Sequence, residues 1–269
     1  MTKTCSELFQ GMDCAIIGNG NEEVAGLAFR SDEVAPGDMF FCIVGTVVDG
    51  HSFAQDAIDR GATSLVAERK VYLADATDVT EVVVSDSRKA MAYASANYYD
   101  NPSRAFSLVG ITGTNGKTTT TYLVEHIASV AGNRCGVIGT VGNKIAGVME
   151  HAERTTPESP DLQKLFARMR DAGCTVVAME VSSHALDLRR TWDTDFAVTA
   201  FTNLTQDHLD YHHTFDDYFE AKALLFSRDY PARRVVCIDD KWGRELLRRC
   251  STNGDNVVTT GFDPAAQIH

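Results

Sequence analysis

The stretch GITGTNGKTTT, from Gly110 to Thr120, decides the fold class of this sequence. An apolar run from Ala105 to Ile111 precedes the glycine-rich part and predicts a buried strand, and apolar residues at helical spacing continue to Gly132 and predict a helix. A glycine-rich turn between a strand and a helix presents backbone N–H groups and the positive end of the helix dipole to an anion. We therefore interpret the stretch as a phosphate-binding loop.

The residue types within this loop fit nucleotide chemistry. Lys117 would reach the β- and γ-phosphates, and the hydroxyl of Thr118 would bind Mg²⁺. The strict pattern G-x-x-x-x-G-K-[ST] is not met, because Ile111 stands at the first glycine position and Gly113 supplies the flexible point instead. An ordinary glycine turn that opens a helix is the alternative. The residues that we expect to contact the phosphates are Gly113, Thr114, Asn115, Gly116, Lys117, Thr118 and Thr119.

Composition and charge limit the class of protein. The chain has 269 residues, 44% of them hydrophobic, which is enough for one large or two ordinary domains with real cores. A formal net charge of −12, without a stripe of Lys and Arg, argues against nucleic-acid binding. The N-terminus lacks the apolar segment of a signal peptide, and no stretch of about eighteen apolar residues occurs. We expect a monomeric, cytoplasmic protein without membrane insertion.

The seven cysteines are scattered and form no C-x-x-C pair. Several of them stand inside apolar runs that predict strands. This pattern favours buried thiols in a reducing compartment over disulfides or a zinc site.

Predicted strands and helices alternate along the whole chain. A helix over residues 87–99 should end at Asn101-Pro102, because the residue before proline is pushed out of the helical region. We place a domain boundary near Ser103, which gives a small α/β domain over 1–103 and a second domain over 104–269. After the phosphate loop and its helix, the second domain is predicted to contain a polar stretch that continues to Arg154, three further helices near 159–172, 215–227 and 243–250, and strands within 134–142, 174–182, 196–204, 233–240 and 256–262.

Buried strands that alternate with helices predict an α/β fold with a doubly wound, mostly parallel sheet. Ligands of such sheets bind outside the carboxyl ends of the strands. The chain stops at DPAAQIH, directly after a predicted strand, so we expect the second domain to be incomplete at its C-terminal end.

Polar residues gather at the expected ends of two neighbouring strands, in MEVSSH and TNLTQDHLDYHH. Glu180 lies where an acidic group can complete a Mg²⁺ shell, and the alternative is a salt-bridged residue at a strand end. His208 and His212 have the spacing of a zinc-binding helix, but without H-E-x-x-H they are interpreted, taken alone, as turn residues. Composition alone would make Lys222 a solvent-facing lysine of a helix.

Five motifs in order resemble the Mur ligase family, and within it the MurE type. They are GTNGKTT at 113–119, TTPES at 155–159, MEVSSHAL at 179–186, FTNLTQDHLDYH at 201–212 and FEAKALLF at 219–226. Residues 27–53 are similar to the UDP-sugar-binding domain of that family. The resemblance implies an ATP-dependent amide ligase of peptidoglycan biosynthesis. Such an enzyme adds the third amino acid, diaminopimelate or lysine, to UDP-N-acetylmuramoyl-L-alanyl-D-glutamate through an acyl phosphate.

The same resemblance implies roles for individual residues. Lys117, Glu180, His208 and Lys222 would be catalytic, with a first Mg²⁺ on Thr118 and Glu180. His208 would bind a second Mg²⁺ together with Lys222, whose amine is carboxylated in this family. The residues that would contact the UDP-muramoyl substrate are Phe29, Ser31, Thr46, Val47, Val48, Thr155, Thr156, Ser182 and Arg190.

Three alternatives remain at this point. The family has a C-terminal domain that this sequence lacks, so we expect little turnover from this chain alone, and a truncated, non-catalytic UDP-muramoyl-binding homologue is the first alternative. A related amide ligase, of the MurF, cyanophycin synthetase or folylpolyglutamate type, is the second, although TTPES and MEVSSHAL favour the MurE type. A switch-type nucleotide hydrolase is the third, and it explains only GTNGKTT.

Overall fold

The computed structural model describes residues 2–45, 47–73 and 78–269. The chain divides into two compact units, Met1–Asn101 and Pro102–His269. The assignment of a UDP substrate to the first unit and of ATP to the second stays a prediction.

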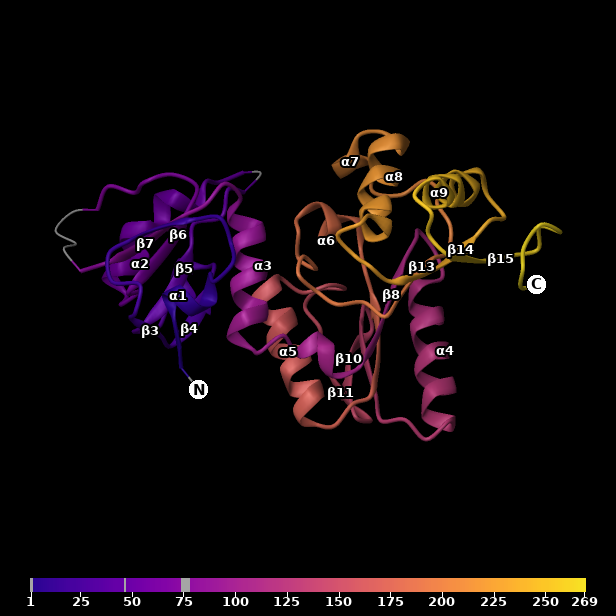
Figure 1. Cartoon of the computed structure of the whole chain (residues 1–269), viewed down its shortest axis with the longest axis horizontal. Helices are drawn as coiled ribbons and strands as arrows, with labels where there is room; N and C mark the ends of the chain where they lie inside the picture. The colour runs from indigo at the N-terminus through magenta and orange to yellow at the C-terminus, as the bar shows by residue number, and fades with distance from the viewer. Residues whose placement is uncertain (1, 46, 74–77) are drawn as a thin grey trace. The chain divides into compact units, whose positions relative to one another are not determined.

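The helices and strands follow in chain order (Figure 1). The strands are β1 (Lys3–Thr4), β2 (Ala15–Ile17), β3 (Glu23–Val24), β4 (Gly26–Ala28), β5 (Asp38–Phe41), β6 (Ser64–Ala67), β7 (Thr80–Val83), β8 (Ser107–Thr112), β9 (Cys135–Gly139), β10 (Gly142–Ile145), β11 (Val148–Glu150), β12 (Val176–Glu180), β13 (Val198–Phe201), β14 (Arg233–Cys237) and β15 (Val257–Thr260). The α-helices are α1 (Cys5–Leu8), α2 (Ala54–Asp59), α3 (Ser87–Tyr98), α4 (Lys117–Val130), α5 (Ser159–Asp171), α6 (Ser183–Asp187), α7 (Leu209–His212), α8 (Phe215–Ala223) and α9 (Lys241–Thr252). Short 3₁₀ turns are η1 (Ser31–Glu33), η2 (Gly50–Phe53), η3 (Pro102–Ala105) and η4 (Leu224–Phe226).

The first unit is built on a five-stranded sheet in the order β2-β7-β6-β5-β4. Its pairs are parallel except for β2 with β7. Successive side chains of a strand point to opposite faces, so Met39 and Phe41 of β5 join the core cluster that contains residues of α1 and α3, while Phe40 joins the cluster that contains residues of α2. Burial on both faces explains why β5 is part of a continuous apolar run in the sequence.

Helix α3 ends where the sequence predicted. The carboxylate of Asp86 caps its first turn by accepting from the N–H groups of Arg88 and Lys89, both at 3.0 Å. The helix stops at Tyr98, and Asp100 and Asn101 take positive φ values of 61° and 49° before the proline.

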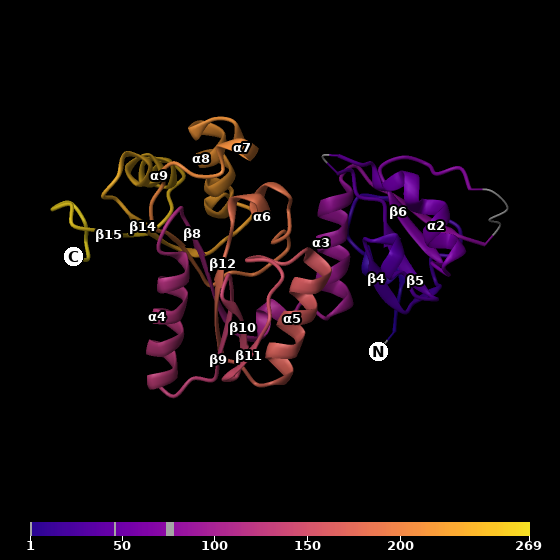
Figure 2. The same ribbon diagram turned by 180° about the vertical axis from the view of Figure 1, so that it is seen from behind.

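The second unit is built on an eight-stranded sheet in the order β11-β10-β9-β12-β8-β13-β14-β15. The pairs from β9 to β15 are parallel, and only β9 with β10 and β10 with β11 are antiparallel. Helices α4 and α5 lie on opposite sides of these strands (Figures 1 and 2). The predicted doubly wound, mostly parallel sheet is thus confirmed.

One prediction for this unit was wrong. The stretch before Arg154, expected to be merely polar, contains the β10–β11 hairpin, in which Ile145 pairs with Val148. Its two turn residues, Ala146 and Gly147, both have positive φ, at 48° and 96°, as a type I′ turn requires. Alanine is rare in that conformation, so the sequence carried no hairpin signal. The two- and three-residue strands β1 to β4 were too short to be predicted.

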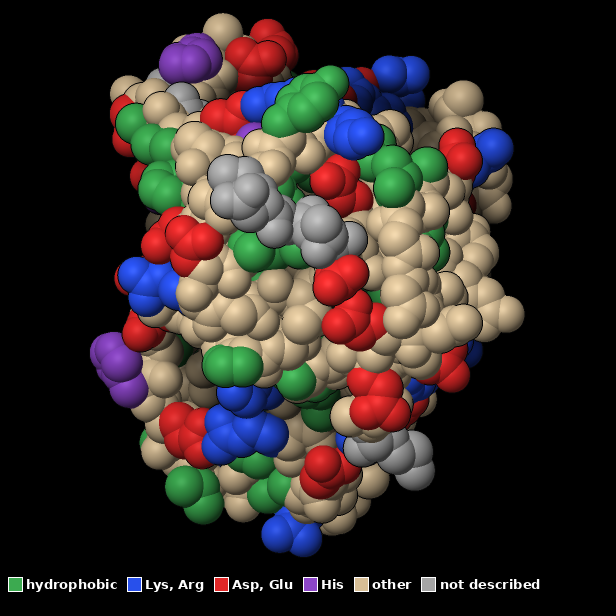
Figure 3. Space-filling model, turned by 90° about the vertical axis from the view of Figure 1, so that its left-hand side faces the viewer, with side chains coloured by type: hydrophobic (Ala, Val, Ile, Leu, Met, Phe, Trp, Pro, Cys, Tyr) green, Lys and Arg blue, Asp and Glu red, His purple; other side chains and the backbone are tan. Residues whose placement is uncertain are grey.

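The cysteines and the surface agree with a globular chain of mixed charge. All seven cysteines are free thiols, and five of them are buried, namely Cys5, Cys42, Cys135, Cys174 and Cys250. In the described part of the chain no helix is long and apolar enough to cross a bilayer. Asp and Glu side chains lie interspersed with Lys and Arg on the face that Figure 3 shows.

Candidate functional site

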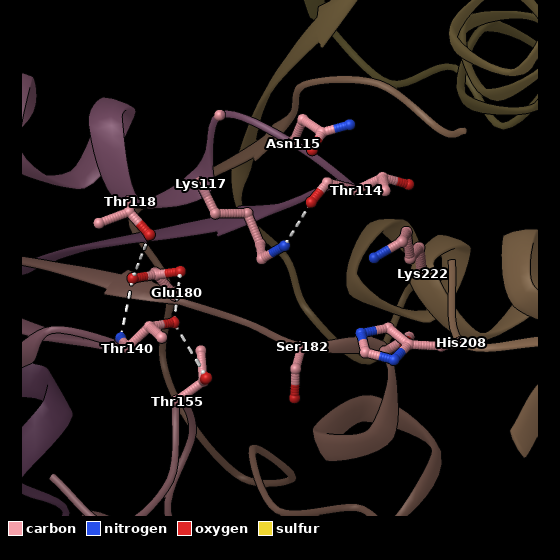
Figure 4. Close-up of a pocket in the computed structure, with 12 residues that line it drawn as sticks. Thr114, Asn115, Lys117, Thr118, Thr140, Thr155, Glu180, Ser182, His208 and Lys222 are labelled. Carbon is pink, nitrogen blue, oxygen red and sulfur yellow. Dashed lines mark hydrogen bonds between the residues drawn. The ribbon is translucent and has the colours of Figure 1, made fainter. Parts of the chain in front are cut away.

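A cavity of about 300 Å³ lies where β8, β9, β12 and β13 of the second unit end (Figure 4). The fold brings together here residues that the sequence places on separate segments, because parallel strands end at the same edge of a sheet. The residues that line the cavity are Thr114, Asn115, Gly116, Lys117, Thr118, Thr140, Thr155, Glu180, Ser182, Ser183, His208 and Lys222.

The predicted phosphate loop connects β8 to α4. Gly116 directly precedes the helix with φ of 85°, and Gly113 has φ of 144°, a conformation that other residues rarely adopt. A Cβ atom at Gly113 would also overlap the hydroxyl of Thr202. Gly113 is therefore needed both for its backbone angles and for the close approach of the next segment.

The segment that follows β13 fixes the shape of this loop. The N–H of Thr114 donates to the carbonyl of Asn203 at 2.9 Å, and the N–H of Asn115 donates to the Asn203 side chain at 3.0 Å. The hydroxyl of Thr202 donates to the carbonyl of Asn115 at 2.7 Å. Contacts on both sides of the backbone hold the loop in one conformation, which lowers the entropic cost of binding a ligand there.

Replacing Gly113 with Ala should disrupt this arrangement. We expect the free energy of unfolding to fall by about 1–3 kcal/mol, because alanine is strained at this φ, and nucleotide affinity to fall at least about tenfold. Gly132→Ala is the matched control, because Gly132 has φ of 87° but has open space around its Cβ position. Chemical unfolding and nucleotide titration of both variants test this, and unchanged nucleotide affinity in Gly113→Ala would show that the loop does not bind phosphate.

Lys117 is held against the loop that precedes it. Its amine donates to the carbonyl of Gly113 at 2.9 Å. It also donates to the carbonyl of Thr114 at 2.8 Å (Figure 4). Burial lowers the pKa of Lys117, and the negative charges of Glu180 and Asp207 oppose that shift. A cation at this place can receive a phosphate oxygen with little rearrangement of the backbone.

Glu180 is the last residue of β12 and is only 1% exposed. Its Oε1 atom accepts from the hydroxyl of Thr118 and from the N–H of Thr140, both at 2.9 Å, and its Oε2 atom accepts from the hydroxyl of Thr140 at 3.2 Å. Room for the carboxylate depends on Gly139, where a Cβ atom would overlap it. The partners found for Glu180 among the described residues are hydroxyl and amide groups, which does not support the salt-bridged alternative.

Lys222 is buried, although the composition of its segment predicted a solvent-facing lysine of a helix. It lies on α8 with 1% exposure, and its amine donates to the carbonyl of Gly113 at 2.8 Å. The amine also lies 4.5 Å from the centre of the Tyr218 ring. Burial, and then the charge of Lys117, hold the pKa of Lys222 well below its usual value. The amines of Lys117 and Lys222 thus share the carbonyl of Gly113 as an acceptor.

The two histidines of the predicted i, i+4 pair have different surroundings. His208 precedes α7 with φ of 50° and lines the cavity, and its Nε2 atom lies 3.3 Å from a carboxylate oxygen of Asp207. His212 is buried and its Nε2 atom lies 2.9 Å from the hydroxyl of Ser183. Burial, and then the nearby His184, lower the pKa of His212. The pair therefore does not face a common ligand, and only His208 is available to the cavity.

The predicted substrate residues of the second unit have two kinds of environment. Thr155 and Ser182 line the cavity. Thr156 is buried, and its hydroxyl donates to the carbonyl of Glu180 at 2.8 Å. Arg190 is 9% exposed, pairs with Glu158 at 2.8 Å and donates to the carbonyl of Thr156 at 3.1 Å. Arg190 is therefore a buried, paired residue and not a solvated surface charge.

The predicted substrate residues of the first unit belong to one strand end and one loop. Phe29 follows β4 and packs against the core, and Ser31 begins η1. Val47 and Val48 are exposed, at 92% and 51%. Thr46 lies outside the described residues.

Sequence reasoning missed several residues around the cavity. Thr140 lines it, and the hydroxyl of the buried Tyr218 lies 3.2 Å from that of Thr114. Ser183, which the sequence placed at this strand end without a specific role, also lines the cavity. The signal for Thr140 was its place directly after the apolar run of β9. A second hollow, of about 400 Å³, lies at the ends of β13 and β14 and is lined by Leu204, Thr205, Gln206, Phe215, Asp216, Asp240, Lys241 and Trp242.

Comparison with known proteins identifies the family to which this chain is similar. A family model described as the Mur ligase middle domain matches residues 111–269, and one described as the catalytic domain of the Mur ligase family matches residues 23–111. The chain is similar to UDP-N-acetylmuramoyl-L-alanyl-D-glutamate–2,6-diaminopimelate ligase of Clostridium botulinum, with 42% identity over 95% of this chain and 52% of that protein. It is 50% identical to the enzyme of that name from Geobacillus thermodenitrificans, over 78% of this chain and 42% of that protein.

Solved structures support the same conclusion. A structure of a ligase with that name matches 99% of this chain and 54% of its own, with a TM-score of 0.82 and 25% sequence identity. The chain spans about half the length of the curated relatives it matches. The family matches together cover residues 23–269, and they confirm the predicted resemblance: the chain belongs to the Mur ligase family.

Proposed function

We propose that this chain provides the UDP-substrate and ATP-binding parts of a ligase that joins 2,6-diaminopimelate to UDP-N-acetylmuramoyl-L-alanyl-D-glutamate. The observation that carries the proposal is the meeting of Lys117, Glu180 and Lys222 in one cavity at the end of a strand–loop–helix phosphate site. The names of the relatives supply the substrates. Free cysteines support a reducing, cytoplasmic location.

The nucleotide would lie along the phosphate loop. Its β- and γ-phosphates would accept hydrogen bonds from the amine of Lys117 and from backbone N–H groups at the start of α4. The second hollow adjoins the loop through Thr205, which accepts from the side chain of Asn115 at 3.1 Å. Its aromatic residues Phe215 and Trp242 suit a purine, and its acidic residues suit the hydroxyl groups of a ribose.

Thr118 and Glu180 fit a Mg²⁺ ion. Both present oxygen atoms to the cavity, and hydroxyl and carboxylate oxygens are the ligands that this ion prefers. A bound Mg²⁺ would neutralise phosphate charge as it develops. The chain's own contribution is to hold the Glu180 carboxylate through the hydroxyl of Thr118 and the backbone N–H of Thr140, so that it does not have to reorganise.

Lys222 fits the carboxylation that the family resemblance implies. An uncharged amine can add to CO₂, giving a carbamate and releasing one proton, and the lowered pKa of Lys222 increases the uncharged fraction near neutral pH. The carbamate would turn a buried cation into an oxygen ligand. Beside His208, it would provide a place for a second Mg²⁺.

The reaction would then proceed in two steps. The carboxylate of the D-glutamyl residue attacks the γ-phosphorus of ATP, ADP leaves, and an acyl phosphate forms. The amine of diaminopimelate attacks the acyl carbon, the tetrahedral intermediate expels phosphate, and the amine proton passes to solvent. Lys117 stabilises the negative charge of the first step, and Thr155 and Ser182 orient the acceptor beside it.

Calorimetric titration tests this proposal directly. We expect UDP-N-acetylmuramoyl-L-alanyl-D-glutamate to bind at least about tenfold more tightly than UDP-N-acetylglucosamine, because the dipeptide adds amide and carboxylate groups that can make further polar contacts. We also expect the Mg²⁺ complex of a non-hydrolysable ATP analogue to bind. A folded sample that binds neither ligand would overturn the proposal. Phosphate release on addition of diaminopimelate and ATP then distinguishes a ligase from a chain that only binds.

A further inference from the structure

A single hydroxyl group connects the two sides of the cavity. The hydroxyl of Thr140 lies 3.2 Å from Oε2 of Glu180 and 3.0 Å from the hydroxyl of Thr155 (Figure 4). Glu180 also accepts from Thr118, the residue after the loop lysine. The chain of hydrogen bonds therefore runs from the expected nucleotide side, through Glu180 and Thr140, to the expected acceptor side at Thr155.

The chemistry of the groups sets the direction of these bonds. An ionised carboxylate only accepts, and a threonine hydroxyl has one hydrogen to donate. The Thr140 hydrogen is therefore directed to Glu180, and the Thr155 hydrogen is directed to Thr140. The remaining lone pairs of Thr155 are left for a donor group of a ligand in the cavity. A ligand that reorients Thr155 removes the donor to the Thr140 oxygen, and because linked hydrogen bonds polarise one another, it changes the strength of the bond from Thr140 to Glu180.

The side chain of Thr140 contributes little to the fold apart from its hydrogen bonds to Glu180 and Thr155. It follows β9 as an exposed residue, and its N–H bond to Glu180 belongs to the backbone and persists whatever the side chain. Removal of the hydroxyl should therefore leave the fold and the position of the Glu180 Oε1 atom intact. Only the link to Thr155 and the contact with Oε2 would be lost.

We propose that Thr140 is a positioning residue that couples nucleotide binding to acceptor binding, because its hydroxyl connects Glu180 with Thr155. This inference rests on the proposed function, since it assigns the two ligands to the two sides of the cavity. An acceptor that orders Thr155 orders Thr140, and through it the carboxylate that faces the nucleotide. By linkage, the effect must be reciprocal and equal in both directions.

The test measures the coupling and not affinity alone. The acceptor UDP-N-acetylmuramoyl-L-alanyl-D-glutamate is titrated into the protein with and without the Mg²⁺ complex of a non-hydrolysable ATP analogue, and the reverse titration is made. We expect each ligand to tighten the other about tenfold, within the usual range of allosteric coupling. In Thr140→Val the factor should fall below about twofold, while each ligand alone binds within about threefold of its original affinity.

Four further variants make the result specific. Thr140→Ser keeps the hydroxyl and should retain the coupling. Thr155→Val should lose it, and the double variant Thr140→Val/Thr155→Val should lose no more than either single variant, because both remove the same link. Thr252→Val, which removes an exposed hydroxyl on α9 bonded to the carbonyl of Arg248, should change nothing.

The outcomes separate this inference from the proposed function. If the protein binds both ligands and Thr140→Val retains the coupling, or if no coupling exists, the role of Thr140 is overturned and the proposed function stands. If the protein binds neither ligand, both fail together. A loss of coupling in Thr140→Ser equal to that in Thr140→Val would also overturn the inference, because the hydroxyl would then not be the cause.

Discussion

Lys117→Met should reduce the affinity for the Mg²⁺ complex of an ATP analogue by about 100-fold or more. The amine of Lys117 is held by the carbonyls of Gly113 and Thr114 at the start of α4, where a phosphate would bind. A charge-assisted hydrogen bond contributes about 1.5–3 kcal/mol, so the loss of two such bonds to phosphate oxygens gives at least this factor. Calorimetric titration of the variant measures it.

Lys144→Met is the matched control for this variant. Lys144 lies on β10 and pairs with Glu125 at 3.0 Å, and it does not line the cavity. The same change of residue type should leave nucleotide affinity within about twofold of that of the unchanged protein. The partly exposed ion pair of Lys144 contributes only to the free energy of unfolding, by about 0–1 kcal/mol. Equal affinities of the Lys117 and Lys144 variants would show that the loop binds no phosphate.

The strand–loop–helix arrangement of the predicted phosphate loop could be predicted because its determinants are local. Strand, glycine turn, Lys117 and Thr118 follow one another directly, and the chemistry of each residue type limits what the turn can bind. Glu180 was predictable for a related reason, since a residue at the end of a buried parallel strand must lie at the ligand edge of the sheet. The hairpin of β10 and β11 could not be predicted, because its type I′ turn at Ala146 and Gly147 lacks the usual Asn-Gly signal.

The burial of Lys222 and Arg190 could not be inferred from neighbouring residues. Arg190 is buried because Glu158, which is far away in the sequence, supplies its countercharge at 2.8 Å. Lys222 is buried because one face of α8 packs inward. The spacing of Tyr218 and Lys222 does place them on one face of a helix, and Tyr218 is fully buried, so that signal was present but ambiguous. Long-range packing decides such cases, and one sequence does not reveal it.

If the chain acts as proposed, Lys222→Met should strongly reduce catalysis while leaving the protein at least as stable as before. We expect ADP formation from ATP and the UDP-muramoyl dipeptide to fall by about 100-fold or more, the usual cost of removing a preorganised electrostatic group from an active site. With ¹³C-labelled bicarbonate, the unchanged protein should show a carbamate signal in its ¹³C spectrum. The signal should be absent from Lys222→Met and present in Lys144→Met.

The expected stability of Lys222→Met follows from the free-energy penalty of burying the lysine amine in the folded protein. Burial holds the pKa of Lys222 well below its usual value, which means that the folded protein disfavours the charged form. Methionine fills a similar volume without that cost, and the carbonyl of Gly113 keeps the amine of Lys117 as a donor at 2.9 Å. The thermal midpoint should therefore stay equal or rise. A large fall would mean that Lys222 is a structural residue, and loss of activity in the variant would then reveal nothing about catalysis.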